Sequence, residues 1–233
     1  MLSRNDIKTI RSLREKKFRD SFGLFVVEGE KMVREALDSG LEVVRVVSRE
    51  EEGPEVMAKL SSFTTPPPVL AVVRKPAPAS PGTPAGLCLA LDSVRDPGNL
   101  GTILRIADWF GIDRVYASPG TVEIYNPKVI QASMGTIFRK ELVYCDLPLL
   151  CESFAASGLK VFGTFLDGAD IYTSELRPEG LIVMGNESVG ISPEVAARVD
   201  TRLTIPSFSK GLGAESLNVA VATAVTVSEF RRR

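Results

Sequence analysis

Short apolar segments alternate with helical patterns through residues 87–230, and this alternation constrains the fold more than any other feature of the sequence. Apolar strands separated by helical crossovers form mainly parallel sheets that are covered by helices on both faces. We therefore predict an α/β fold built on such a sheet. The predicted strands are 86–94, 113–118, 140–145, 159–166, 180–186 and 201–206. The predicted helices between them are 98–111, 127–138, 148–158 and 192–200.

A proline-rich stretch, "RKPAPASPGTPAG" at residues 74–86, divides the chain. Such a composition is typical of a semi-rigid linker. We predict a first domain at residues 1–75, a linker at 76–86 and a second domain at 87–233. The first domain should be a small α/β sandwich with strands at 24–29, 41–48 and 69–75. Its helices are indicated by the spacing of Ile7, Ile10 and Leu13 and by the segment 28–40.

The composition excludes several classes of function. The chain has no histidine, which excludes Ser-His-Asp and Cys-His catalysis and histidine-ligated metals. Its three cysteines follow no metal-binding spacing, so we expect no metal and a reducing cytoplasm. No apolar stretch reaches the ~18 residues of a membrane span, and the first residues lack the apolar core of a secretory signal.

The charge is unevenly distributed. Residues 1–19 carry seven Lys and Arg side chains against two acidic ones, while residues 76–230 carry an excess of acidic groups. A run of charge on a helix is often only a solvated face. A basic arm beside an acidic body also favours a polyanionic partner such as nucleic acid.

Three strand-to-helix junctions are unusually polar and rich in glycine. The first, residues 91–111, contains Asn99 in a position to cap the following helix, and Arg105 away from that helix's apolar stripe. The second, residues 182–192, is neither a P-loop nor G-x-G-x-x-G, and its glycines would let a ligand approach the backbone. Either junction alone could be a polar turn beside a capped helix.

The third junction, residues 203–225, runs from a strand through a glycine-rich loop to Ser216, the predicted N-cap of an apolar helix. A helix without a polar face is expected to be buried on all sides. Ligands in parallel sheets bind outside the carboxyl ends of the strands, and all three junctions follow predicted strands. Three such junctions in one domain indicate a site more strongly than any one of them.

Together the stretches "DPGNLGTILRIADWFG", "MGNESVGIS" and "IPSFSKGLGAESLNVAVA", in this order, resemble the three motifs of the SpoU/TrmH family of RNA ribose 2′-O-methyltransferases in the SPOUT superfamily. Residues 126–139 also resemble the segment these enzymes carry between their first two motifs. The resemblance covers residues 87–230. The first domain resembles, less distinctly, the small substrate-binding domain often fused to these enzymes.

The resemblance implies S-adenosylmethionine as the methyl donor and RNA as the acceptor, with ribosomal RNA favoured over transfer RNA. It also implies a homodimer and a C-terminal trefoil knot, in which the apolar last helix would be buried. Composition and spacing alone would not suggest a knot, since threaded connections are almost absent from known folds.

Residue by residue, the family's motifs place five catalytic positions and four cofactor-binding positions in this chain. The catalytic positions are Asn99, Arg105, Glu187, Ser216 and Asn218. The cofactor-binding positions are Gly185, Ile205 and Leu217, with Thr164 close by. In the family, the arginine matching Arg105 is given the task of removing the hydroxyl proton. Because a guanidinium rarely deprotonates, we expect Arg105 instead to bind the adjacent phosphate and stabilise the developing alkoxide.

The chain departs from the family pattern in two places: the loop 207–215 is longer than in most members, and Ala220 stands where many carry serine. Two other classes of function stay open from the residues alone. One is an RNA-binding protein that keeps the fold without catalysis, although it would not need all five polar positions. The other is a nucleotide-binding oxidoreductase, which the absence of G-x-G-x-x-G disfavours.

Overall fold

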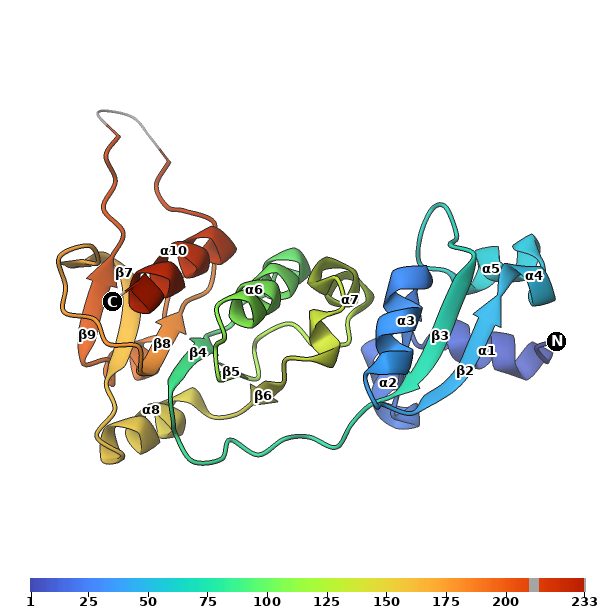
Figure 1. The fold of residues 1–233 in the computed structure, drawn as a ribbon, viewed down its shortest axis with the longest axis horizontal. Coiled ribbons are helices and arrows are strands. Elements are labelled where there is room, and N and C mark those ends of the chain that lie inside the picture. The colour runs from blue at the N-terminus through green and yellow to red at the C-terminus, as the bar shows by residue number, and fades with distance from the viewer. Residues whose placement is uncertain (210–213, 233) are drawn as a thin grey trace. The chain divides into compact units, whose positions relative to one another are not determined.

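The chain forms two compact units in the computed structural model, which describes residues 1–209 and 214–232 (Figure 1). The N-terminal unit comprises Met1–Pro78 together with Glu123–Arg139. The C-terminal unit comprises Ala79–Val122 and Lys140–Arg233. No helix in the described part of the chain has the length and apolar character that crossing a membrane requires.

The N-terminal unit is built on a three-stranded antiparallel sheet in the order β1-β3-β2. Its strands are β1 (Leu24–Glu28), β2 (Val43–Ser48) and β3 (Val69–Arg74), in close agreement with the sequence prediction. Its helices are α1 (Arg4–Ser12), α2 (Lys16–Phe22), α3 (Glu30–Asp38), α4 (Arg49–Glu52), α5 (Pro54–Leu60) and α7 (Pro127–Ser133), with a 3₁₀ turn η1 (Thr136–Phe138).

Apolar spacing explains how these helices pack. Ile10 and Leu13 of the first helical region are buried, as their spacing predicts, against Val47, Leu70 and other apolar residues of the sheet and α5. The short helices α4 and α5 have no counterpart in the sequence prediction. Each is at most seven residues long, which leaves too little room for an apolar period to be recognised.

Residues 123–139 pack with the N-terminal unit although they lie within the span predicted for the second domain. The ring of Phe25 in β1 lies 4.6 Å from that of Tyr125 and 6.5 Å from that of Phe138. The buried guanidinium of Arg19 forms an ion pair with Glu123 and donates 2.8 Å hydrogen bonds to the carbonyls of Leu13 and Arg14. Aromatic contacts and a buried charge pair therefore hold the segment to β1 and α2.

The single helix predicted at 127–138 is wrong, because α7 ends at Ser133. Met134 and Gly135 both adopt the left-handed conformation, with φ of 52° and 96°. A left-handed residue ends a helix, and the chain resumes only as the 3₁₀ turn η1.

The C-terminal unit contains a six-stranded sheet in the order β6-β5-β4-β8-β7-β9, and all five neighbouring pairs are parallel. Its strands are β4 (Leu87–Leu91), β5 (Arg114–Ala117), β6 (Leu142–Tyr144), β7 (Val161–Asp170), β8 (Gly180–Met184) and β9 (Thr201–Thr204). Its helices are α6 (Pro97–Trp109), α8 (Leu147–Ala156), α9 (Pro193–Ala196) and α10 (Val219–Arg232). The mainly parallel sheet predicted from the sequence is confirmed.

Helices cover both faces of this sheet (Figure 1). Cys88 and Ala90 of β4 pack with Phe154 of α8, while α6 and α10 lie side by side on the other face. On that face the ring of Phe162 in β7 meets Phe230 of α10 edge to face, 4.8 Å between centroids. Every residue of β4 and β8 is buried, as expected for central strands covered on both sides.

Replacing Glu123 with Gln should destabilise the N-terminal unit by about 3 kcal/mol, because Arg19 is only 2% exposed and would lose its counter-charge. Hydrogen exchange of the β1 and β3 amides measures the loss in this unit alone. The matched control is Glu42→Gln, which removes the exposed ion pair with Arg74 in the same unit and should cost much less, because exposed ion pairs contribute little to stability. Equal losses in the two variants would contradict the assignment of the buried pair.

Candidate active site

Glu187 lies in the loop after β8 and is held by groups from the start of α6. Its carboxylate accepts a 3.0 Å hydrogen bond from Asn99 Nδ2 and longer ones, 3.3 and 3.4 Å, from the main-chain amides of Asp96 and Arg95. The second predicted junction is thus joined to the first, as the ends of adjacent parallel strands allow.

Asn99 also joins the third junction, because its Oδ1 accepts a 2.8 Å hydrogen bond from Asn218 Nδ2. Both ends of the Asn99 amide are therefore used, one as donor and one as acceptor. The hydrogen-bond chain Asn218–Asn99–Glu187 connects residues that lie 119 and 88 positions apart in the sequence. Three of the five predicted catalytic positions are in direct contact through this chain.

The same contacts keep Glu187 ionised. Partial burial disfavours its charged form. The hydrogen bonds from Asn99 and from the main-chain amides of Glu187 itself, Arg95 and Asp96 outweigh burial, so the pKa of Glu187 is held below its ordinary value. A lowered folded-state pKa means that this contribution to stability is present above about pH 4.5 and is lost as the pH falls through the folded-state pKa.

Asn186, which sequence analysis did not assign to the site, shapes the Glu187 loop. Its Nδ2 donates to the carbonyl of Ser93 at 2.6 Å, and its Oδ1 accepts from the amides of Ser188 and Val189. The main chain of Asn186 pairs with that of Gly190 in both directions, at 2.9 and 3.0 Å. These bonds close a tight loop that holds Glu187 toward α6.

Gly185 is needed by this loop itself. A Cβ placed there would lie 2.4 Å from the main-chain carbon of Gly190, so any larger residue would force the loop open. The sequence predicts that glycine here lets a ligand approach the backbone. The structure adds a reason internal to the chain, because only glycine fits against Gly190.

Asp92 is a second residue that sequence analysis did not select. It follows β4 directly, is 4% exposed, and its Oδ2 accepts a 2.8 Å hydrogen bond from the amide of Ser192. The sequence signal that could have pointed to Asp92 is a carboxylate placed directly after a fully apolar segment. Its contact fixes the end of the Glu187 loop to the central strand.

Two predicted helix caps are wrong by a few residues. Asp96, not Asn99, caps α6, because its side chain accepts the amide of Asn99 at 2.8 Å. Asn218, not Ser216, lies at the start of α10, where its Oδ1 accepts the amides of Ala220 and Val221 at 2.9 and 3.3 Å. Asn218 thus both caps α10 and holds Asn99.

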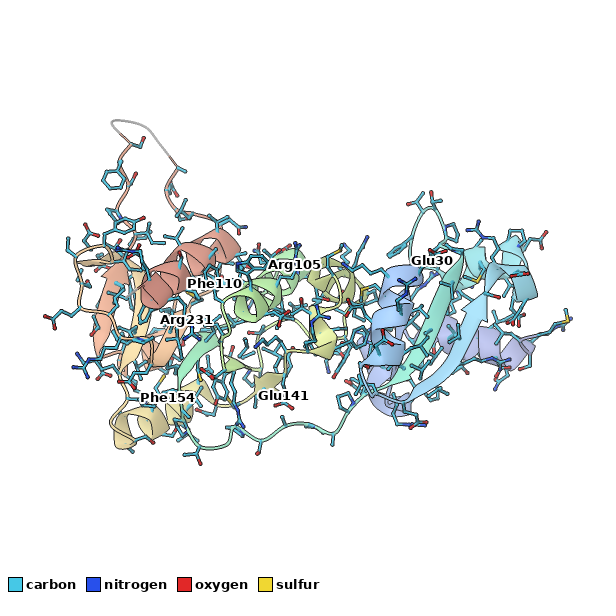
Figure 2. All side chains as sticks on the ribbon, viewed as in Figure 1. Glu30, Arg105, Phe110, Glu141, Phe154 and Arg231 are labelled. Atoms are coloured by element: carbon cyan, nitrogen blue, oxygen red, sulfur yellow. The ribbon has the colours of Figure 1, made fainter. Side chains whose placement is uncertain are left out.

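Arg105 and Ser216 stand apart from the hydrogen-bond chain. Both are exposed, and neither side chain makes a hydrogen bond or ion pair with a described residue. Arg105 projects from α6, away from the buried Ile103 and Ala107, as predicted (Figure 2). Both polar groups are therefore available to a ligand.

Arg231 fixes the far end of α6. Its guanidinium donates to the carbonyl of Phe110 at 2.8 Å and to that of Gly111, close to the end of that helix (Figure 2). A cation at a helix C-terminus also interacts favourably with the helix dipole. This arginine near the C-terminus thus positions the helix that carries Asn99 and Arg105.

The predicted cofactor positions lie within or directly after three adjacent strands and just before α10. Thr164 is in β7, Gly185 follows β8 and Ile205 follows β9, while Leu217 precedes α10. Outside the strand ladders, Gly185, Ile205 and Leu217 make no main-chain hydrogen bond with another described residue. Ile205 is half-buried and Leu217 is 49% exposed.

Main-chain groups next to strand ends, beside partly exposed apolar side chains, fit a ligand with an aromatic ring and hydrogen-bonding edges, as S-adenosylmethionine has. Residues 210–213 of the long loop noted in the sequence lie outside the described residues. Among the described residues, no three Cys, Asp or Glu side chains come together in a group that could hold a metal ion.

Comparison with known proteins decides the family. The model of the SpoU rRNA methylase family matches residues 86–228, and that of the MRM3-like substrate binding domain matches residues 4–72. The chain belongs to the SpoU rRNA methylase family. The family resemblance found in the three motifs is thereby confirmed.

Some relatives and solved structures match this chain over nearly its whole length. The 23S rRNA (guanosine(2553)-2′-O)-methyltransferase RlmP of Bacillus subtilis is 31% identical over 241 residues, which cover 97% of this chain and 95% of that protein. The structure of a TrmH-family protein from Porphyromonas gingivalis matches with a TM-score of 0.89 at 42% identity, over 100% and 99% of the two chains. An rRNA methyltransferase from Sinorhizobium meliloti, solved with AdoMet bound, matches with a TM-score of 0.87 at 29% identity, over 100% and 97%.

Ser216 and Asn218 should behave differently on substitution, because only Asn218 caps α10. Asn218→Ala should lower the free energy of unfolding by about 1 kcal/mol. Ser216→Ala should leave it within about 0.5 kcal/mol of the parent value. Urea denaturation followed by circular dichroism measures both. A Ser216→Ala variant as unstable as Asn218→Ala would show that Ser216 supports the fold.

Proposed function

We propose that this SpoU-family chain transfers a methyl group from S-adenosylmethionine to a ribose 2′-hydroxyl of ribosomal RNA. The observation that carries the proposal is the hydrogen-bond chain Asn218–Asn99–Glu187, which unites the three family motifs at the carboxyl ends of parallel strands. The relatives support the reaction, since RlmP is named for 2′-O-methylation of 23S rRNA.

Ribosomal RNA is favoured over transfer RNA because two relatives that match both units are named for rRNA. RlmP and the Sinorhizobium rRNA methyltransferase match both units, over 97% and 100% of this chain. A neighbour described by its 2′-OH methylation of C/U34 on tRNA covers only 63%. The N-terminal unit is thus shared with the relatives whose substrate is rRNA.

S-adenosylmethionine would be held by the main chain at Gly185, Ile205 and Leu217, with Thr164 beside them. It supplies an electrophilic methyl group on a positively charged sulfur. The chain's own contribution is mainly to place the ribose oxygen in line with that methyl group, and positioning of this kind can account for much of a rate enhancement.

The roles of the polar side chains follow from their contacts. Glu187 and Asn99 are already engaged with each other, so we assign them to fixing the geometry of the loops. Arg105 is free, and we assign it to the phosphate beside the target ribose and to the negative charge that develops on the 2′-oxygen. Ser216, also free, is assigned to the substrate side of the site, as the family motif implies.

We propose that the N-terminal unit binds the RNA. This unit contains the first domain predicted from the sequence, residues 1–75. Of the seven basic residues near the N-terminus, Arg14 and Arg19 donate to carbonyl or carboxylate groups and Lys16 and Lys17 pair with acidic side chains. The remaining three, Arg4, Lys8 and Arg11, are exposed and lie on one face of α1 at i, i+4 and i+7. This stripe can contact phosphates.

The proposal includes a cytoplasmic homodimer with a C-terminal trefoil knot. The sequence predicts that α10 is buried on all sides, but within one chain Val221 of this helix is 51% exposed. In the neighbouring helix α6, Trp109 is 86% exposed. These apolar surfaces on two packed helices suit a second copy of the chain. Sedimentation equilibrium should give twice the monomer mass.

Purified chain should transfer labelled methyl from S-adenosylmethionine to unmodified, in vitro transcribed 23S rRNA, and not to a transfer RNA transcript. Arg105→Ala should reduce the rate by at least about 100-fold, since it removes a preorganised charge at the reacting centre. Arg105→Lys should retain RNA affinity and part of the activity. No transfer to 23S rRNA by the parent chain would refute the proposed function, and a lysine variant as inactive as alanine would refute a purely electrostatic role.

A further inference from the structure

The N-terminal unit contains a pocket that none of the predicted site residues explains. It measures about 200 Å³ and lies between β1, α3, the loop 61–63 and α7. Its walls are mainly apolar and are formed by Val26, Met32, Phe63, Pro127, Ile130 and Met134. Its polar lining residues are Glu28, Lys31, Ser62 and Gln131.

The polar groups of this pocket fall into two kinds. Glu28 is fully engaged, because its carboxylate accepts from the hydroxyl of Ser61 and from both the amide and the hydroxyl of Ser62. Lys31 and Gln131 are exposed, and their side chains make no hydrogen bond or ion pair with a described residue. An apolar pocket therefore carries one free ammonium and one free amide at its edge.

The wall that carries Phe63 is fixed in place. The contacts of Glu28 hold the loop at Ser61 and Ser62, and the amide of Phe63 donates to Ser61 Oγ at 3.0 Å. Arg14 also donates to the carbonyl of Ser61. The aromatic side chain is thus presented by a loop that is ordered before any ligand binds, which reduces the entropy cost of binding.

Met134 adds a strained position to the opposite wall. Its φ of 52° is left-handed, a conformation that usually selects glycine or asparagine at the end of a helix. Its side chain lines the pocket and is 46% exposed. This conformation ends α7, and a methionine there carries backbone strain that a glycine would avoid.

We propose that this pocket binds one unstacked nucleobase of the RNA substrate. Single-stranded RNA is recognised by splayed bases that stack on aromatic and apolar side chains and are read along their edges by hydrogen bonds. The amide of Gln131 offers both a donor and an acceptor to a base edge, and Lys31 offers a charge to the flanking phosphate. The pocket is smaller than the roughly 300–1,000 Å³ of sites for drug-sized ligands, which fits a single ring system.

This inference rests on the proposed function, since it requires an RNA substrate. It goes further by assigning recognition of the RNA to a defined place and by giving a role to α7, which follows β5 in sequence but packs with the N-terminal unit. The pocket would select a substrate with an accessible single-stranded base.

Met134→Gly is the most discriminating variant. Glycine relieves the left-handed strain and removes the pocket wall, so the melting temperature should be unchanged or higher while the Kd for in vitro transcribed 23S rRNA rises about 10-fold. Phe63→Ala should weaken RNA binding by a similar factor, and Phe63→Trp should restore it. The Kd is measured by filter binding, and the affinity for S-adenosylmethionine should stay within twofold of the parent value.

The contribution of the Lys31 charge to RNA binding is tested by a matched pair of lysine variants. Lys31→Ala should weaken RNA binding and lower the slope of log K against log salt by about one. Lys160→Ala removes the same charge from an exposed position in the C-terminal unit and should change neither.

Any one of three results would overturn the proposal that the pocket binds a base. These are parent-like RNA affinity in Met134→Gly, parent-like RNA affinity in Phe63→Ala, or equal losses of RNA affinity in the two lysine variants. Failure of the proposed function has a different signature, which is absence of methyl transfer by the parent chain. Because the Kd is measured without turnover, it tests the pocket in that case as well.

Discussion

The side-chain amide of Asn99 is the contact on which the arrangement of the site depends. Its nitrogen donates to Glu187 and its oxygen accepts from Asn218, so one planar group fixes three loops that are remote in sequence. Each partner has a further anchor: Glu187 accepts main-chain amides at the start of α6, and Asn218 caps α10. A group that used only its donor or only its acceptor could join two loops but not three.

The sheet makes this contact possible. Parallel strands end at one edge, and the loops after β4 and β8, whose strands are hydrogen-bonded neighbours, bring Asn99 and Glu187 together. The helix that carries Asn99 is fixed at both ends, by Asp96 at its start and by Arg231 just beyond its end. The free Arg105 therefore projects from a rigid support, which suits a group that must meet a charge at a defined place.

Sequence analysis predicted the strands of both units and the three loops, because apolar runs and glycine-rich junctions are local signals. It misplaced both caps by a few residues, since aspartate, serine and asparagine are all good caps and several stand close together. It missed the packing of residues 123–139 with the N-terminal unit, which depends on the distant partners Arg19 and Phe25. The roles of Asn186 and Gly185 in closing a loop also required the three-dimensional contacts.

A double-mutant cycle of Asn99→Ala and Asn218→Ala tests the central claim most directly, with S-adenosylhomocysteine binding measured by calorimetry. Either change breaks the same hydrogen-bond chain, so the double variant should bind about as weakly as the weaker single variant. The coupling energy should then be at least about 1 kcal/mol. Effects that add within about 0.3 kcal/mol would show that the two residues act independently and would contradict the shared role of the Asn99 amide.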